Sequence, residues 1–387
     1  MNEAQIKERV AAFLREHDPS GDRLEFLRAR FDAGLAWVWF PEGLGGLGAP
    51  RELQQVVERE LADTPQLNSG KQGIGLGMAA PTILAFGTEE QKRRFLKPLW
   101  TGEEIWCQLF SEPGAGSDLA TLATRAVRDG DEWVIDGQKV WTSGAHHARW
   151  AILVARTDPD VPKHRGLTYF ICDMHAPGVE VRPLRQITGE AEFNEVFLTG
   201  VRLSDDLRLG AVGDGWRVAQ TTLMNERVAI GGAPTRRGGG VMASVLSAWR
   251  EHPELRSHDL HQRLLSLWVE AEVTRLSGVR LREQLAAGQP GPEGSGMKLS
   301  FAKLNQALTG LEMEFRRELT YDDWTFRRSE NVDFYGRGPG YRYLRAKGNS
   351  IEGGTSEILR NIISERVLGL PSEPRVDKDV PWKDLPR

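Results

Sequence analysis

Two stretches of the chain combine small, hydroxylated and aromatic residues in a way that suits ligand binding. The segment CQLFSEPGAGSDLA, residues 107–120, begins on an apolar run and is dense in small side chains and hydroxyls. Small side chains let backbone amides approach a planar or anionic ligand closely. Trp141, Thr142 and Ser143 end a predicted strand and offer a flat aromatic face beside two hydroxyls. Each stretch also has a simpler interpretation, the segment as a surface turn and Trp141 as a core aromatic.

Motifs of several other enzyme classes are absent from the sequence. It has no G-x-S-x-G elbow, no Walker loop and no H-E-x-x-H helix, so the usual signs of a serine hydrolase, a nucleotide triphosphatase or a zinc peptidase are missing. His146 and His147 are adjacent, and neighbours along a strand point to opposite faces, so we expect no shared metal site. Gly43, Gly45 and Gly48 match G-x-G-x-x-G without a preceding strand, which predicts a loop between helices.

Composition narrows the class of protein further. The chain has 387 residues, 40% hydrophobic and 27% charged, with 50 basic and 54 acidic side chains and a formal net charge of −4. This balance argues against a general nucleic-acid or anionic-membrane surface. The two cysteines, Cys107 and Cys172, are too few for a disulfide framework and indicate a reducing compartment. No apolar run approaches the ~20 residues of a membrane span, and the start is charged, so we expect a cytoplasmic protein.

The elements that must position these residues follow from the hydrophobic period. Residues 1–103 are predicted to be helical, with Ile6, Val10 and Phe13 on one stripe and a helix start at the Thr88–Gln91 capping box. Residues 104–208 alternate polar and apolar positions around two Asp-Gly turn signals, and WAILVAR, LTYFICDM and EFNEVFL are strand candidates.

Helical spacing returns over residues 209–387, in HDLHQRLLSLWVEAEVTRLSGVRL, SFAKLNQALTGLEMEF and TSEILRNIISERVLGL. The order is therefore helices, strands, helices, without the strand-helix alternation of a parallel sheet. The prediction is an α+β chain of three domains, 1–103, 104–208 and 209–387.

Several of these motifs together resemble the acyl-CoA dehydrogenase family. They are SEPGAGSD, WTSGA, FNEVFLTGVRL, GDGW and IEGGTSEILRNIISERVLGLP, and the resemblance runs from PEGLGGLG to Pro371. It implies an N-terminal helical domain, a central β-barrel and a C-terminal four-helix bundle. It also implies FAD as cofactor and desaturation of an acyl-CoA thioester between its α and β carbons.

The resemblance assigns roles by motif position. A carboxylate base would take the α-proton while the β-hydrogen leaves as hydride to the flavin. Trp141 would cover the isoalloxazine ring, with Thr142 beside it and Ser143 near the hydride-accepting nitrogen. Further residues would line the flavin and thioester region or lie near the cofactor's other end, namely Gln108, Phe110, Ser111, Ser117, Thr355 and Glu357. Ser117, Arg227 and Gly354 would contact the substrate.

The position of the base departs from the commonest family pattern. Many members place it in a tyrosine-glutamate-glycine-threonine loop, but counting back from Thr355 puts Gly353 there and Glu352 one residue earlier. A second group, including isovaleryl- and long-chain-type enzymes, takes the carboxylate from a helix ending in Glu-Arg. LMNERVAIGG places Glu226 at that position, so Glu226 is the predicted base and Glu352 the alternative. Without the family, Glu226 and Arg227 would be interpreted as a solvated surface pair.

Two motifs that contact the ADP part of a neighbour's FAD are missing. Neither arginine-x-x-phenylalanine-glycine nor glutamine-x-x-glycine-glycine is present, and FRRSENVDFYGRGPGYRYLR lies roughly where they would be. Arg327, Arg337 and Arg342 are candidates for the pyrophosphate, with a solvated basic loop as the other interpretation.

The resemblance also bears on partners. It implies an acyl-CoA substrate, an electron-transfer flavoprotein, and either a homodimer or tetramer or a heteromer with a second acyl-CoA dehydrogenase chain. Two alternatives stay open: a subunit without chemistry of its own, and a flavin oxidase or monooxygenase of the same fold. No metal is expected.

Overall fold

The computed structural model describes residues 1–231, 236–286, 292, 294–316 and 338–386, and the chain forms two compact units. The first comprises residues 1–183, 193–222 and 377–387, and the second comprises residues 184–192 and 223–376. Within the described ranges, none of the helices combines the length and the hydropathy that a membrane crossing requires.

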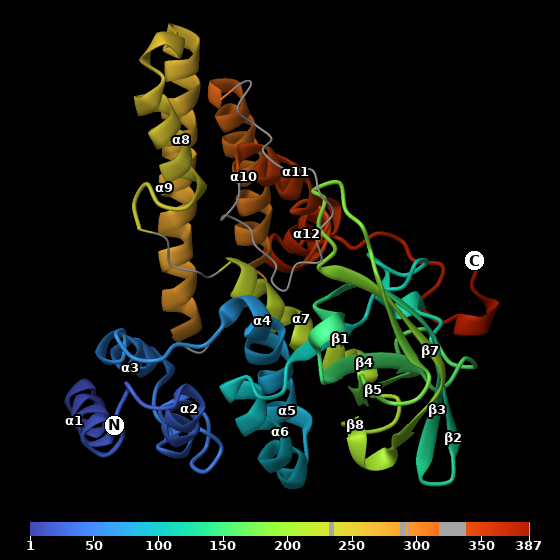
Figure 1. Cartoon of the computed structure of the whole chain (residues 1–387). Coiled ribbons are helices and arrows are strands. Elements are labelled where there is room, and N and C mark those ends of the chain that lie inside the picture. Colours follow the sequence, from blue (N-terminus) through green and yellow to red (C-terminus); the bar gives the residue numbers. More distant parts are fainter. Residues whose placement is uncertain (232–235, 287–291, 293, 317–337, 387) are drawn as a thin grey trace. The chain divides into compact units, whose positions relative to one another are not determined.

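The first unit begins with the predicted helices (Figure 1). They are α1 (Glu3–Glu16), α2 (Arg23–Asp32), α3 (Gln54–Glu60), α4 (Ser69–Ile74), α5 (Ala80–Phe86) and α6 (Glu89–Thr101). The Thr88–Gln91 capping box is confirmed at the start of α6, because each side chain bonds the other residue's backbone N–H. Ile6, Val10 and Phe13 lie in the core of these helices.

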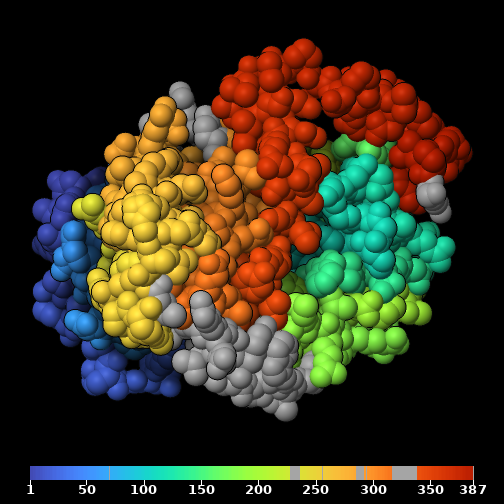
Figure 2. All heavy atoms as spheres, turned by 90° about the horizontal axis from the view of Figure 1, so that it is seen from above, coloured from blue at the N-terminus to red at the C-terminus, as the bar shows by residue number. Residues whose placement is uncertain are grey.

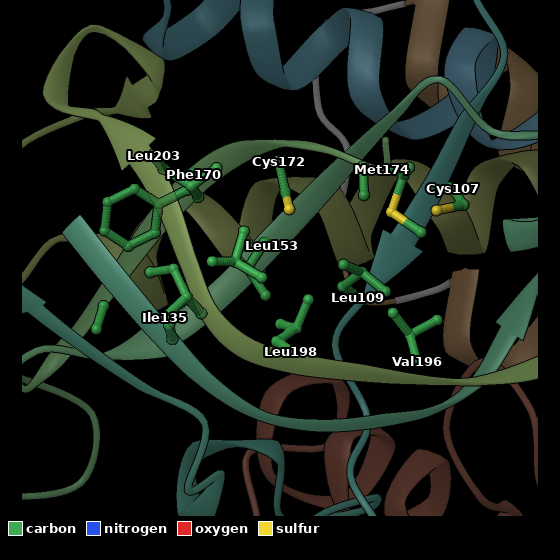
Figure 3. Close-up of a cluster of buried hydrophobic side chains, with 14 of the residues drawn as sticks. Cys107, Leu109, Ile135, Leu153, Phe170, Cys172, Met174, Val196, Leu198 and Leu203 are labelled. Atoms are coloured by element: carbon green, nitrogen blue, oxygen red, sulfur yellow. The ribbon is translucent and has the colours of Figure 1, made fainter. Parts of the chain in front are cut away.

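An eight-stranded sheet follows in the order β6-β7-β3-β2-β4-β5-β8, with β1 parallel to β4. The strands are β1 (Trp106–Leu109), β2 (Arg125–Asp129), β3 (Glu132–Ser143), β4 (Trp150–Arg156), β5 (Leu167–Asp173), β6 (Val179–Pro183), β7 (Phe193–Ser204) and β8 (Arg208–Leu209). The three predicted strand segments are confirmed as β4, β5 and β7. Figure 3 shows the apolar cluster between the strands, which contains both cysteines.

The prediction of a turn at each of the two Asp-Gly pairs is wrong for one of them. Gly130 follows Asp129 in the turn between β2 and β3, but Gly137 lies inside β3 at an irregularity in its pairing with β7. A Cβ at Gly137 would lie 2.3 Å from Thr124 Oγ1, so glycine serves here for close packing.

The second unit is helical. Its elements are α8 (Val241–Glu251), α9 (His258–Ala286), α10 (Gly294–Arg316), α11 (Pro339–Gly348) and α12 (Ser356–Ile362), while α7 (Gly215–Gly231) begins in the first unit and ends in the second. α10 packs against α8, α9 and α11. Figure 2 shows the yellow atoms of α8 and α9 beside the orange atoms of α10. Leu264, Leu308 and Phe315 lie in their shared core.

Candidate functional site

Trp141 is displayed at the surface by an unusual backbone conformation. Its φ is +61°, the single positive φ of a non-glycine residue in the described ranges. The side chain is 58% exposed and meets Phe193 edge-on, so the core-aromatic interpretation is wrong. A bulky residue rarely adopts this conformation without a compensating reason. The strained backbone therefore holds a flat indole face at the surface.

The hydroxyl of the next residue in the sequence, Thr142, has no hydrogen-bond partner in the described part of the chain. Thr142 is 1% exposed, and its Oγ1 is buried without a hydrogen bond. Leaving a buried hydroxyl unsatisfied costs about 1–3 kcal/mol, so this side chain is buried at a local cost to stability. The Thr142 carbonyl accepts from Asn194 Nδ2 at 3.0 Å, which fixes the residue. The exposed indole face fits a flat heterocycle such as a flavin, whereas the Thr142 hydroxyl has no exposed surface through which a ligand could reach it.

The SEPGAGSD segment is anchored by a buried ion pair. Lys139 Nζ lies 2.8 Å from Glu112 Oε1, and the side chains are 0% and 8% exposed. Lys139 also donates to the Phe110 carbonyl, and the Val140 amide donates to the Ser111 carbonyl. Burial raises the pKa of Glu112, but the Lys139 ammonium and backbone donors outweigh it, so the pKa lies below its usual value.

The predicted ligand residues of this segment differ in exposure. Phe110 is buried, Gln108 and Ser111 are half-buried, and Ser117 is exposed. The geometry therefore gathers Gln108, Phe110 and Ser111 at the end of β1, while Ser117 lies further along the anchored loop.

The predicted base lies in the second unit. Glu226 is half-buried near the C-terminal end of α7. Its carboxylate lies close enough to the ammonium of Lys298, on α10, to stabilise the charged form of that lysine. Lys298 Nζ also donates to the Gly354 carbonyl at 2.7 Å. Glu226 is therefore electrostatically linked to the turn that holds the alternative base position. The backbone of Arg227 continues α7, and its side chain lies outside the described residues.

The alternative carboxylate is engaged in the turn itself. Glu352 accepts from Arg345 Nη2 at 2.7 Å and from Asn349 Nδ2 at 2.6 Å. The next two residues, Gly353 and Gly354, have φ of +62° and +95°. These values favour glycine over any residue with a Cβ.

The residues assigned to the cofactor's other end have local contacts. Thr355 is the N-cap of α12, because its Oγ1 accepts from the Ile358 amide, and exposed Glu357 pairs with Arg360. Arg342 is bound to fully buried Glu312 on α10, with Nε to Oε2 at 3.0 Å. Arg342 therefore joins α11 to α10 and is not part of a solvated basic loop. Arg327 and Arg337 lie outside the described residues.

Sequence reasoning missed two buried lysines, Lys139 and Lys298. Lys139 follows Gln138 in an alternating strand and Lys298 lies in an amphipathic helix, and in both settings a lysine is normally exposed. One pattern in the sequence could have indicated a special role for Lys298. Together with Asn305 and Gln306 it places polar residues two helical turns apart on an otherwise apolar face of the helix.

Comparison of the chain with known proteins identifies its family. The family models described as acyl-CoA dehydrogenase N-terminal, middle and C-terminal domains match residues 2–103, 107–201 and 213–368. The chain belongs to the acyl-CoA dehydrogenase family. Members are FAD-dependent flavoprotein oxidoreductases, and the exposed face of Trp141 fits that cofactor.

Two relatives from Mycobacterium tuberculosis differ in length. Acyl-CoA dehydrogenase IpdE1 is 39% identical over 372 residues, 93% of this chain and 91% of that protein. Acyl-CoA dehydrogenase FadE34 is 43% identical over 346 residues, 88% of this chain but 45% of that protein. The chain thus spans less than half the length of FadE34.

Two solved structures share the fold. The ChsE4-ChsE5 complex of Mycobacterium tuberculosis matches with a TM-score of 0.69 at 27% identity, over 96% of this chain and 97% of that chain. The Tcur3481-Tcur3483 steroid ACAD matches with a TM-score of 0.73 at 24% identity, over 96% and 98%.

Proposed function

We propose that this acyl-CoA dehydrogenase desaturates an acyl-CoA thioester between Cα and Cβ with Glu226 as the base. The observation that best supports this is the difference between the two candidate carboxylates. Arg345 and Asn349 already bond the carboxylate of Glu352, and α7 carries Glu226 at the position that the second group of the family uses for its base. A carboxylate held by a guanidinium is a poor proton acceptor.

The roles of the residues follow from the chemistry. When bound, FAD accepts the β-hydride. Trp141 would cover the flat ring with Thr142 beside it, Ser143 would offer its hydroxyl to the polar edge, and the 108–117 segment would line the same region. Glu226 takes the α-proton, which is weakly acidic. An amide at Gly353 or Gly354 donates to the thioester carbonyl, where negative charge develops.

The division of the chain is part of the proposal. We assign the helical domain to 1–103, the sheet domain to 104–208 and the C-terminal helical domain to 209–387. Ser117 and Arg227 are assigned to the substrate, and Thr355 and Glu357 to the far end of FAD.

The partners are a further part of the proposal. FadE34 has room for a second segment of this size, and the ChsE4-ChsE5 structure is a complex. We therefore assign this chain to a heteromer with a second acyl-CoA dehydrogenase chain, with an electron-transfer flavoprotein as electron acceptor. A large acyl group is the first to test, because a fold neighbour is a steroid ACAD.

Anaerobic bleaching of the bound flavin tests the proposal. The chain, alone and with its co-purified partner, is mixed with a series of acyl-CoA esters that includes steroid acyl-CoA. Glu226→Gln should retain FAD and abolish bleaching. Glu352→Gln is the matched control, with one acid-to-amide change at the same turn, and should still bleach. Bleaching by Glu226→Gln together with its loss in Glu352→Gln would move the base to Glu352.

A further inference from the structure

The C-terminal segment, residues 377–386, belongs to the first unit and lies against the loop between β4 and β5. Its backbone bonds to that loop at two successive residues. The Trp382 amide donates to the Val161 carbonyl at 2.9 Å, and the Lys383 amide donates to the Pro159 carbonyl at 3.1 Å. These bonds hold the indole of Trp382 next to the residues that follow SEPGAGSD.

Two side chains hold three consecutive carbonyls directly after SEPGAGSD. Trp382 Nε1 donates to the Thr121 carbonyl at 3.0 Å. Arg156, on β4, donates to the carbonyls of Ala120 at 2.5 Å and Leu122 at 3.1 Å. The guanidinium of Arg156 lies 4.4 Å from the centroid of the Trp382 ring, a cation–π contact. The C-terminal segment therefore takes a direct part in fixing the end of the loop.

A buried lysine joins the C-terminal segment to SEPGAGSD itself. Lys163 Nζ lies 2.5 Å from Asp118 Oδ2 and 2.5 Å from Asp377 Oδ2. The Lys163 side chain is 5% exposed, and a lysine is seldom buried to this degree unless it is paired. Its ammonium offsets two carboxylates that would otherwise repel each other. Lys163 is thus the link between the last residue of SEPGAGSD and the C-terminal segment.

The part of SEPGAGSD before this link is open. A Cβ added at Gly114 or Gly116 would meet no atom beyond its chain neighbours within 4 Å, and Ser117 is exposed. Small residues let a ligand approach the backbone closely. The buried ion pair between Glu112 and Lys139 fixes the start of this part, and the C-terminal segment fixes its end.

We propose that Lys163 and Trp382 are positioning residues, which hold the open part of SEPGAGSD in the conformation that binds the acyl-CoA ligand. The inference rests on the proposed function, because that function assigns Ser117 to the substrate. A loop that is already ordered loses less conformational entropy on binding, so its ligand binds more tightly. Neither residue has a part in proton or hydride transfer. Their loss should therefore weaken binding of the ligand.

Binding of acetyl-CoA, measured by isothermal titration calorimetry on the FAD-loaded protein, tests this role. Acetyl-CoA has no β-carbon and cannot be desaturated, so its affinity does not depend on which residue is the base. Lys163→Met leaves Asp118 and Asp377 facing each other without the cation. Trp382→Phe keeps a ring over Arg156 but removes the Nε1 donor. We expect the Kd to rise about tenfold in Lys163→Met and about threefold in Trp382→Phe.

Two further variants separate positioning from a general loss of stability. Lys163→Arg retains the cation and should restore the Kd to within about twofold of wild type. Lys163→Met combined with Asp377→Asn removes the repulsion between the two carboxylates and should recover part of the affinity. A variant that merely destabilised the fold would not be rescued by removal of a second charge.

Lys383→Gln is the matched control. It removes one charge from the same segment, but the Lys383 ammonium pairs with Asp160 at 2.6 Å, in the loop between β4 and β5. This pair is exposed, and such pairs contribute little to stability. The variant should bind acetyl-CoA with the Kd of wild type.

Two results would overturn the inference while wild type binds acetyl-CoA. One is an unchanged Kd in Lys163→Met or in Trp382→Phe, and Trp382→Phe decides the matter if Lys163→Met does not retain FAD. The other is an equal loss of affinity in Lys383→Gln, which would indicate a general loosening of the segment. Failure of the proposed function is distinct. Bleaching in Glu226→Gln would contradict the choice of base alone, and a wild type that does not bind acetyl-CoA would contradict the substrate class together with this inference.

Discussion

Replacing Lys139 should destabilise the first unit strongly. Lys139 lies in β3 with no exposed area, and its Nζ donates to Glu112 Oε1 at 2.8 Å and to the carbonyls of Phe110 at 3.0 Å and Val154 at 2.9 Å. Glu112 in turn accepts from the backbone amides of residues 123 and 124. The pair therefore joins the SEPGAGSD segment to two strands of the sheet.

Lys139→Met removes the cation and leaves a carboxylate and two carbonyls buried without it. Breaking a buried ion pair from one side costs about 3–5 kcal/mol. We expect a decrease of this size in the free energy of unfolding, measured by urea denaturation of the FAD-saturated protein. Lys139→Met with Glu112→Leu should recover part of the loss, since no unpaired charge stays buried.

The free energy of unfolding at acidic pH provides a second measurement. The pKa of Glu112 lies below its usual value in the folded chain. A depressed pKa contributes stability that is complete above the unfolded pKa and is lost as pH falls through the folded one. Wild type should therefore lose more stability on acidification than the double variant. Arg202→Met, which removes an exposed pair with Asp129 and Glu132, is the control. The reasoning fails if Lys139→Met costs no more than this control.

Two further predictions concern the glycine turn and the C-terminal segment. Gly353→Ala should lower the free energy of unfolding by about 1–2 kcal/mol, because φ is +62° at this position. Gly296→Ala on α10 should not lower it, because nothing lies within 4 Å of the added Cβ. Urea denaturation of the two variants measures the difference. Trp382 stacks over buried Arg156 at 4.4 Å, and Arg156 holds the carbonyls that follow SEPGAGSD. Trp382→Leu should therefore speed hydrogen exchange in that segment, whereas Trp39→Leu, which removes a comparable arginine stack, should leave it unchanged.

The sequence predicted helices and strands because buried residues recur along the chain at the spacing of each kind of element. WAILVAR is fully buried as β4, and the α6 capping box forms as predicted. Gly137 was misassigned because an Asp-Gly pair signals a turn only when the next strand folds back, and the close packing against Thr124 is a tertiary contact. Such contacts join residues that are distant along the chain, so local patterns cannot show them.

The candidate site was less predictable where electrostatics decides the role. The resemblance placed Glu226 at the helix position that one group of relatives uses for the base, and left Glu352 as the alternative. The structure adds the bonds that Arg345 and Asn349 make to Glu352, which no local pattern in the sequence indicates. The sequence also could not predict that Trp141 is exposed, because a tryptophan at a strand end is usually buried. Its positive φ depends on the surrounding sheet.

The glycine turn gives a physical reason for a base on a helix. Gly353 adopts a φ of +62°, where any residue with a Cβ is strained, so a glutamate there would have to rebuild the turn. The same turn is fixed by bonds to Glu352 and to the Gly354 carbonyl, which oppose such rebuilding. A carboxylate from α7 needs no change in this backbone. In the reaction that we propose, Glu226 would supply the proton acceptor from a separate element, and the backbone of the turn would stay unchanged.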